Sequence, residues 1–117
     1  MNSQCHLIVE SGPDRGKEIT VPSAGVRLGR SSRNDVVMSD PAMSRFHCRF
    51  FWQTGSTLAV ADLGSSNLTL VNGQPIQEQT LKLGDSIAIG DSLIKVVSVD
   101  PAAGTALKSE VPVPPRP

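Results

Sequence analysis

Short apolar runs separated by turn-forming residues are the feature that most constrains how this chain folds. Runs rich in valine, isoleucine and leucine recur at roughly 8–12-residue intervals, with Gly, Pro, Asn or Asp between them. Apolar residues nowhere recur with the period of a helix. The pattern is typical of an all-β sandwich or barrel, so we predict an all-β fold.

Nine segments are predicted as strands. They cover residues 5–10, 18–21, 26–29, 36–38, 45–52, 57–61, 69–71, 86–89 and 93–99. In residues 45–52, Phe46, Cys48, Phe50 and Trp52 occupy alternate positions, so we predict that all four face the core. Asn72-Gly73 favours a type I′ turn and predicts a hairpin there.

The last segment differs in composition from the rest. Five of the nine prolines lie in residues 101–117, a stretch that cannot build a core and that favours extended conformations. We predict one folded domain over residues 1–100 and a Pro-rich linker or tail, without fixed structure, over residues 101–117. A linker at this position suggests that the chain is the N-terminal module of a longer protein.

The charge distribution indicates a discrete anionic ligand. Formal net charge is zero, which disfavours nucleic acid and anionic membranes as partners. Residues 27–49 nevertheless hold five basic side chains against two acidic ones. The basic residues are Arg27, Arg30, Arg33, Arg45 and Arg49.

The cysteines and the absence of targeting segments bear on location. Cys5 and Cys48 match no Cys-x-x-Cys spacing and lie in apolar runs, so we favour reduced thiols over a disulfide between them. The sequence shows no signal peptide and no apolar run near 18 residues. We expect a cytoplasmic or otherwise intracellular protein that does not insert into a membrane.

The residues argue for binding rather than catalysis. The sequence has no phosphate loop of the Gly-x-x-x-x-Gly-Lys-Ser/Thr kind, no His-Glu-x-x-His and no His/Cys/Asp cluster. We therefore expect no metal, no cofactor and no enzymatic activity. A Ser44–His47–Asp62 triad is the enzymatic alternative. We disfavour it because residues three apart on a strand point to opposite faces and no nucleophile elbow surrounds Ser44.

Three separated blocks carry the groups that hold a phosphate. They are Gly29-Arg30, then Ser44-Arg45-Phe46-His47, then the stretch from Ser65 to Gly73. Arginine offers a planar fork of donors with a permanent charge, and serine and asparagine add neutral donors. Any one block alone would suit an ordinary surface loop, but the three together favour a site for a doubly charged phosphate.

The order and spacing of these blocks resemble the forkhead-associated (FHA) domain, a family that reads phosphothreonine. Its signature runs Gly-Arg, Ser-x-x-His and Ser/Thr-x-Asn-Gly-Thr-x-x-Asn-Gly, and this chain departs from it at Leu68, which replaces the glycine after Asn67. The resemblance implies a sandwich of two twisted, mainly antiparallel sheets with about eleven strands.

The resemblance also implies a role for each site residue. The main phosphate contacts would come from Arg30 and Ser44, and auxiliary contacts from Arg45 and Ser66. Asn67 would bond the peptide main chain. Structural support would come from Gly29, which lets the backbone turn, from His47, which braces the loop from inside, and from Asn72 and Gly73, which form the hairpin.

Leu68 affects this expectation directly. If the glycine of the family uses a positive φ, leucine there costs about 1–2 kcal/mol. We therefore expect a shifted loop in which Asn67 no longer faces the peptide.

The expected function is docking onto a phosphothreonine-containing segment of a partner in kinase signalling. That segment would belong to another protein or to the same polypeptide. The alternative is a phosphorylation-independent assembly or oligomerisation module that uses the same loops or a sheet face.

Overall fold

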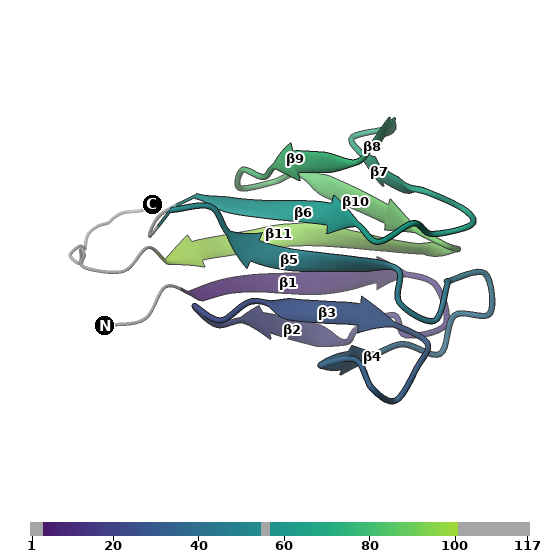
Figure 1. Cartoon of the computed structure of the whole chain (residues 1–117). Helices are drawn as coiled ribbons and strands as arrows, with labels where there is room; N and C mark the ends of the chain where they lie inside the picture. The colour runs from purple at the N-terminus through teal and green to yellow at the C-terminus, as the bar shows by residue number, and fades with distance from the viewer. Residues whose placement is uncertain (1–3, 55–56, 101–117) are drawn as a thin grey trace.

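The chain folds into a sandwich of two β-sheets, as Figure 1 shows. The computed structural model describes residues 4–54 and 57–100. Over these residues there are eleven strands and no helix, which confirms the predicted all-β sandwich. The strands are β1 (Gln4–Ser11), β2 (Glu18–Val21), β3 (Val26–Gly29), β4 (Val36–Val37), β5 (Cys48–Trp52), β6 (Leu58–Asp62), β7 (Thr69–Val71), β8 (Gln74–Ile76), β9 (Glu78–Thr80), β10 (Ser86–Ile89) and β11 (Ser92–Asp100).

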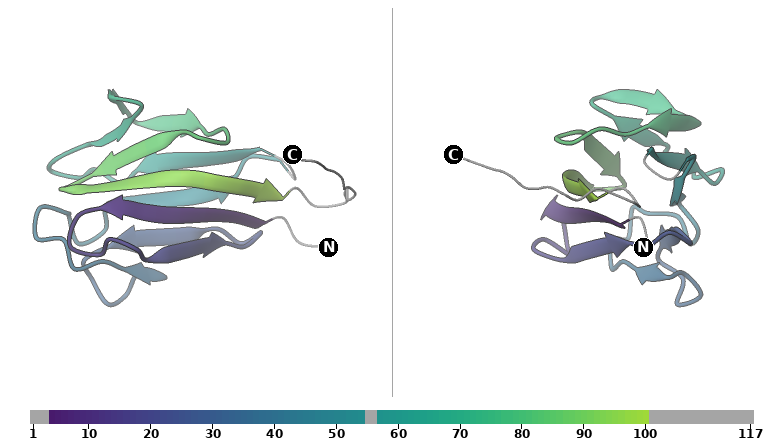
Figure 2. Two further views of the ribbon diagram at one scale, coloured as in Figure 1. Left: turned by 180° about the vertical axis from the view of Figure 1, so that it is seen from behind. Right: turned by 90° about the vertical axis from the view of Figure 1, so that its left-hand side faces the viewer.

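The strands form one six-stranded and one five-stranded sheet. The six-stranded sheet has the order β2-β1-β11-β10-β7-β8, and the five-stranded sheet has the order β4-β3-β5-β6-β9. All the pairings are antiparallel except β3 with β4, which is parallel. The two views of Figure 2 show the sheets as two layers, with long β1 and β11 running through the six-stranded one.

The core lies between the sheets and is built from alternate residues of the strands. β2 follows the alternation strictly, with Ile19 and Val21 buried and Glu18 and Thr20 exposed. Phe50 of β5 is the largest fully buried side chain. Aliphatic residues of both sheets complete the core, among them Leu7, Leu28, Leu58, Ile87, Ile89 and Ile94.

Phe46 corrects the predicted core face of residues 45–52. β5 begins only at Cys48, and Phe46 lies before it with 36% of its surface exposed. Cys48 and Phe50 are buried as predicted, and Trp52 is half-buried and packs against the core. Phe46 differs because it lies in a loop, where the Arg45 carbonyl accepts the N–H of Ser31. The alternation of buried and exposed residues along β5 does not extend into this loop.

β8 and β9 were not predicted. Both are short, mostly exposed and polar, and each lies at the edge of its sheet. An edge strand that buries little has no apolar alternation, so its sequence lacks the signal that marks a strand.

The hairpin at Asn72-Gly73 is confirmed. Asn72 and Gly73 have φ angles of 50° and 85° and connect paired Val71 and Gln74. Two successive positive φ angles are those of a type I′ turn. The Asn72 side chain also donates to Asp85 Oδ1 at 3.0 Å, which fixes the turn to a neighbouring loop.

Other expectations concern the thiols, membranes and the tail. Cys5 and Cys48 are fully buried in different sheets and form no disulfide. In the described part of the chain, no helix is long and apolar enough to cross a bilayer. The Pro-rich segment 101–117 lies outside the described residues, so the predicted domain boundary stays a prediction.

Candidate functional site

Three loops are hydrogen-bonded together at one end of the sandwich. They are the β3–β4 loop (residues 30–35), the β4–β5 loop (38–47) and the β6–β7 loop (63–68), and they lie toward the right of Figure 1. The Arg30 N–H donates to the Ser44 carbonyl at 3.1 Å, and the Ser66 N–H donates to Ser44 Oγ at 3.0 Å. The β4–β5 loop therefore lies between the other two and holds both.

Gly29 is required by close packing, which corrects the expected reason for it. Its φ is not in the left-handed region, so its backbone needs no glycine there. A Cβ at this position would instead collide with the Arg45 carbonyl and lie 2.9 Å from the Ser44 oxygen. Only glycine lets β3 approach the β4–β5 loop this closely.

Arg30 is exposed and anchored at one atom. Its Nε donates to the Met43 carbonyl. This bond fixes the direction of the guanidinium and leaves the terminal Nη groups to bind a ligand. A positioned fork of donors with a permanent charge is suited to a phosphate.

Ser44 is oriented by two bonds. Its Oγ accepts the Ser66 N–H, so its own O–H is the donor that it can offer to a ligand. Its main-chain N–H donates to His47 Nδ1 at 3.0 Å. The hydroxyl is thereby held at the loop surface close to Ser66.

His47 is fully buried and joins two loops through its ring. Because Nδ1 accepts the Ser44 N–H, the proton of the neutral ring is on Nε2, which donates to the Leu68 carbonyl at 2.8 Å. The ring nitrogens thus bind main-chain groups, not the Ser44 hydroxyl or the Asp62 carboxylate. This geometry does not form the Ser44–His47–Asp62 triad.

Leu68 corrects the expectation of a relaxed loop. Its φ is 67°, in the left-handed region that favours glycine, and half of its surface is exposed. Its carbonyl is held by His47, so the buried histidine keeps this backbone in place. Asn67 points toward the β4–β5 loop, where its Nδ2 donates to the Ala42 carbonyl at 2.5 Å. The expectation that the loop relaxes the φ of Leu68 is therefore wrong, whereas the position of Asn67 relative to a bound peptide stays a prediction.

Asp62 organises the β6–β7 loop and was not among the predicted site residues. Its carboxylate accepts the N–H groups of Gly64 and Ser65, the Ser65 hydroxyl, and the Thr69 hydroxyl at 2.7 Å. Burial by itself would raise the pKa of Asp62. The hydrogen bonds from Ser65, Thr69 and Gly64 outweigh burial, and the pKa is lower than usual.

Asp40 positions the β4–β5 loop and was also missed. It is fully buried. Its Oδ1 accepts the Ala42 N–H at 2.8 Å, and its Oδ2 accepts the Asp91 N–H and the Ser92 hydroxyl, both at 2.7 Å. The loop that carries Ser44 is thereby attached to the β10–β11 turn of the other sheet.

Gly90 allows this attachment. A Cβ there would lie 2.9 Å from Asp40 Oδ2 and 3.0 Å from the Met43 nitrogen. No local signal shows that Asp40 joins the two sheets, because its partners Asp91 and Ser92 are about fifty residues away in the sequence.

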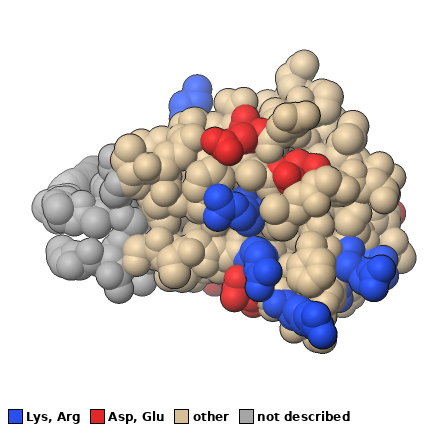
Figure 3. All heavy atoms as spheres, in the orientation of Figure 1, with Lys and Arg blue, Asp and Glu red and all other residues tan. Residues whose placement is uncertain are grey.

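Arg45 and Ser66 are exposed beside Arg30 and Ser44. The main chain of Arg45 is fixed, since buried Asn34 donates to its carbonyl at 2.7 Å. Figure 3 shows basic groups over the lower half of the face of the five-stranded sheet. The arginines of residues 27–49 are all exposed, while no group of His, Cys, Asp and Glu within the described residues could hold a metal ion.

Sequence comparison relates the chain to bacterial regulators. The family model of the FHA domain matches residues 26–90. The oxoglutarate dehydrogenase inhibitor of Corynebacterium diphtheriae is 36% identical over 84 residues, which are 72% of this chain and 58% of that protein. The glycogen accumulation regulator GarA of Mycolicibacterium smegmatis is 33% identical over 84 residues, which are 72% and 52% of the two chains. The chain thus spans little more than half the length of these relatives.

Structural comparison gives the same family. A domain solved in a study of phosphothreonine-dependent FHA domain interactions superposes with a TM-score of 0.72 and 31% identity, covering 84% of this chain and 97% of that one. The matched family model spans all three loops of the site and the strands that hold them. This chain belongs to the FHA-domain family.

Proposed function

We propose that this domain binds phosphothreonine-containing segments of partner proteins and works as an interaction module in kinase signalling. One observation carries the proposal: hydrogen bonds join Arg30, Ser44, Ser66 and Asn67 into one cluster at the loop end of the sandwich. A structurally similar FHA domain comes from work on phosphothreonine-dependent interactions, which supports the same ligand class.

Arg30 and Ser44, which we call the clamp, would act through preformed donors. The Arg30 Nη groups would pair with two phosphate oxygens, and the Ser44 hydroxyl would donate to the phosphate beside them. Arg45 and the Ser66 hydroxyl would add auxiliary contacts. Since the loops are already bonded to one another, little ordering of the protein accompanies binding, and the bonds contribute more of their free energy to affinity.

Asn67 has the groups to hold the peptide main chain. One N–H of its amide is used on the Ala42 carbonyl. The second N–H and the Oδ1 remain a donor and an acceptor, which is the pair that an extended peptide backbone requires. The amide can thus keep the loops together while it binds a ligand.

The proposed activity involves no chemical step. His47 spends both ring nitrogens on main-chain groups, so it is not placed to act as a general base for Ser44. The regulator named as an inhibitor among the relatives supports a non-catalytic module. We also infer an intracellular location, because the proposed ligand is a product of kinases and both cysteines are buried thiols.

Calorimetric titration tests the proposal. The probes are a phosphothreonine peptide selected from an oriented library and its unphosphorylated form. We expect only the phosphopeptide to bind the wild-type domain. Arg30→Ala should weaken it by about 1.5–3 kcal/mol or more, and Arg30→Lys should recover only part of the loss because the fork is missing.

Lys95→Ala is the matched control. Lys95 is exposed on β11 of the six-stranded sheet. Its replacement by alanine also removes one positive charge, but at a position outside the clamp. Unchanged affinity in Arg30→Ala would refute the assignment of the clamp. Equal binding of the unphosphorylated peptide would favour the phosphorylation-independent assembly module instead.

A further inference from the structure

Two arginines and two phenylalanines cross the outer face of the five-stranded sheet beside the site. Arg27 on β3 and Arg49 on β5 are direct cross-strand neighbours, and both are exposed. The Arg27 guanidinium lies 5.8 Å from the centroid of the Phe46 ring, and that of Arg49 lies 4.2 Å from the Phe51 ring. We call these four residues the arginine–aromatic stripe.

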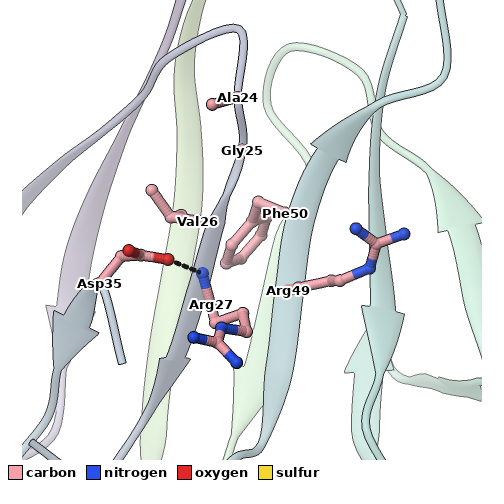
Figure 4. A pocket seen from close by; sticks show the side chains of 7 residues that line it. All are labelled: Ala24, Gly25, Val26, Arg27, Asp35, Arg49 and Phe50. Carbon is pink, nitrogen blue, oxygen red and sulfur yellow. Dashed lines mark hydrogen bonds between the residues drawn. The ribbon is translucent and has the colours of Figure 1, made fainter. Parts of the chain in front are cut away.

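The stripe is not what sheet stability alone would select. Like charges directly opposite each other destabilise an antiparallel pair. Figure 4 shows that the two arginine side chains extend in different directions, which separates their charges. Each guanidinium lies over a ring within the range of a cation–π interaction, which favours these positions of the two cations.

The residues beside the stripe on β6 have small side chains. The cross-strand neighbours of Arg49 and Phe51 are Ala61 and Ala59, of which Ala61 is half-buried and Ala59 is fully buried. A hollow of about 210 Å³ lies beside both arginines.

Asp35 also lines this hollow with its carboxylate. One oxygen of that carboxylate accepts the Arg27 main-chain N–H at 2.9 Å, as Figure 4 shows. The Arg27 guanidinium lies over the Phe46 ring. The hollow therefore has the two arginines of the stripe and one carboxylate in its lining.

The stripe is continuous with the phosphate clamp. Phe46 follows Arg45 in the loop that carries Ser44, and Arg27 lies on the strand that leads into Arg30. Phe46 is among the large hydrophobic side chains that the fold leaves exposed. Arginine and aromatic residues together are enriched in the centres of protein interfaces.

We propose that the arginine–aromatic stripe binds an acidic segment of the same partner whose phosphothreonine occupies the clamp. The inference rests on the proposed function. The two cations complement carboxylates of an extended segment, and the exposed Phe46 ring supplies contact area between them and the clamp. The stripe would thus select phosphothreonines that are flanked by acidic residues on one side.

Extended phosphopeptides test this selection. The library-selected phosphothreonine peptide is lengthened by four glutamates or four glutamines, before or after the phosphothreonine. At low salt we expect the glutamate extension on one side to bind about three- to tenfold tighter than its glutamine counterpart. At about 0.5 M salt the difference should largely disappear, because exposed charges are screened.

Variants assign the difference to the stripe. Arg27→Gln/Arg49→Gln should remove the advantage of glutamate, leave the affinity for the glutamine peptide unchanged and not lower the melting temperature. Lys95→Gln, which removes a charge from the outer face of the other sheet, should keep the advantage.

Each contrary result has a distinct meaning. Equal affinity for the glutamate and glutamine peptides would refute the proposed role of the stripe and leave the proposed function of the clamp unaffected. An advantage of glutamate that persists in the double variant would have the same meaning. A loss of the advantage in Lys95→Gln as large as in the double variant would also overturn it, in favour of a general charge effect. Failure of every phosphopeptide to bind the wild type would overturn the proposed function and this inference together.

Discussion

At the residue scale, Leu68 has a backbone conformation that suits glycine and a side chain that is exposed. Its φ of 67° suits glycine, its side chain is half exposed, and only its carbonyl makes a bond to the site, from His47. A leucine in the left-handed region costs about 1–2 kcal/mol of folding free energy. Replacing it by glycine removes this cost, but glycine is more flexible in the unfolded chain, which offsets about 0.5–1 kcal/mol of the gain.

We therefore predict that Leu68→Gly raises the free energy of unfolding by up to about 1 kcal/mol while binding the phosphopeptide with nearly wild-type affinity. Urea unfolding and calorimetry measure the two effects. Leu83→Gly is the control, since Leu83 is also exposed but has no positive φ, and it should lower stability. A destabilised Leu68→Gly protein would show that the leucine side chain, not its backbone, matters here.

Asp62 connects the charge of one residue to the shape of a loop. Its folded-state pKa is below the ordinary value because donors from Ser65, Thr69 and Gly64 outweigh the effect of burial. A depressed pKa in the folded state means that the carboxylate stabilises the protein above the unfolded pKa of about 4, and that this contribution is lost as pH falls through the lower folded value.

We predict that Asp62→Asn lowers stability at pH 7 and that its difference from the wild type shrinks as pH falls below about 4. Urea titrations over that range provide the measurement. Asp91→Asn, at an exposed carboxylate, should show no such trend. A difference that stays constant down to the lowest pH would contradict the role of the charged form.

At the scale of elements, the β4–β5 loop depends on a contact with the opposite sheet. Asp40 uses both oxygens on donors, Ala42 on one side and Asp91 with Ser92 on the other. The Ala42 and Met43 carbonyls then hold Asn67 and Arg30. Asp40 is thus a positioning residue for the clamp, although it lies in the core.

Asp40→Asn should lower the free energy of unfolding by about 1–3 kcal/mol and weaken phosphopeptide binding, because an amide N–H would face one of these donors. Chemical unfolding and calorimetry test both effects. Asp91→Asn is the control. It makes the same chemical change at a residue that bonds to Asp40 through its main-chain N–H, so this variant should match the wild type. Full binding by a destabilised Asp40→Asn protein would limit Asp40 to folding.

At the scale of the whole molecule, the two buried thiols report on the integrity of the sandwich. Cys5 and Cys48 are fully buried, one in each sheet. Burial, and secondarily the negative charge of Asp62, raises the pKa of the Cys48 thiol, and a neutral buried thiol is a poor nucleophile.

At pH 7, we predict that a thiol reagent labels both cysteines rapidly in denaturant and labels neither in the native domain over the same time. Labelling of the native domain should follow its global unfolding. Mass spectrometry of intact protein counts the labelled thiols. Rapid labelling of native Cys48 alone would show that the five-stranded sheet opens locally.

The features that the sequence predicted are those that neighbouring residues determine. Strands with a buried face repeat apolar residues with period two, and β2, β3 and β10 begin and end where that pattern does. The turn at Asn72-Gly73 follows from the tolerance of these two residues for positive φ. The candidate Arg30, Ser44 and Asn67 could be selected because their chemistry suits phosphate wherever the loops meet.

Only the tertiary structure decided the features that depend on contacts between distant segments. Gly29 is needed because the Arg45 carbonyl approaches it closely. Asp40 can be buried because its carboxylate accepts hydrogen bonds from Asp91 and Ser92. Phe46 faces outward because its loop is hydrogen-bonded to the β3–β4 loop. The bond from His47 similarly holds Leu68 in a conformation that leucine disfavours by itself. Local preferences amount to about 1 kcal/mol per residue, and a few well-placed contacts between distant segments outweigh them.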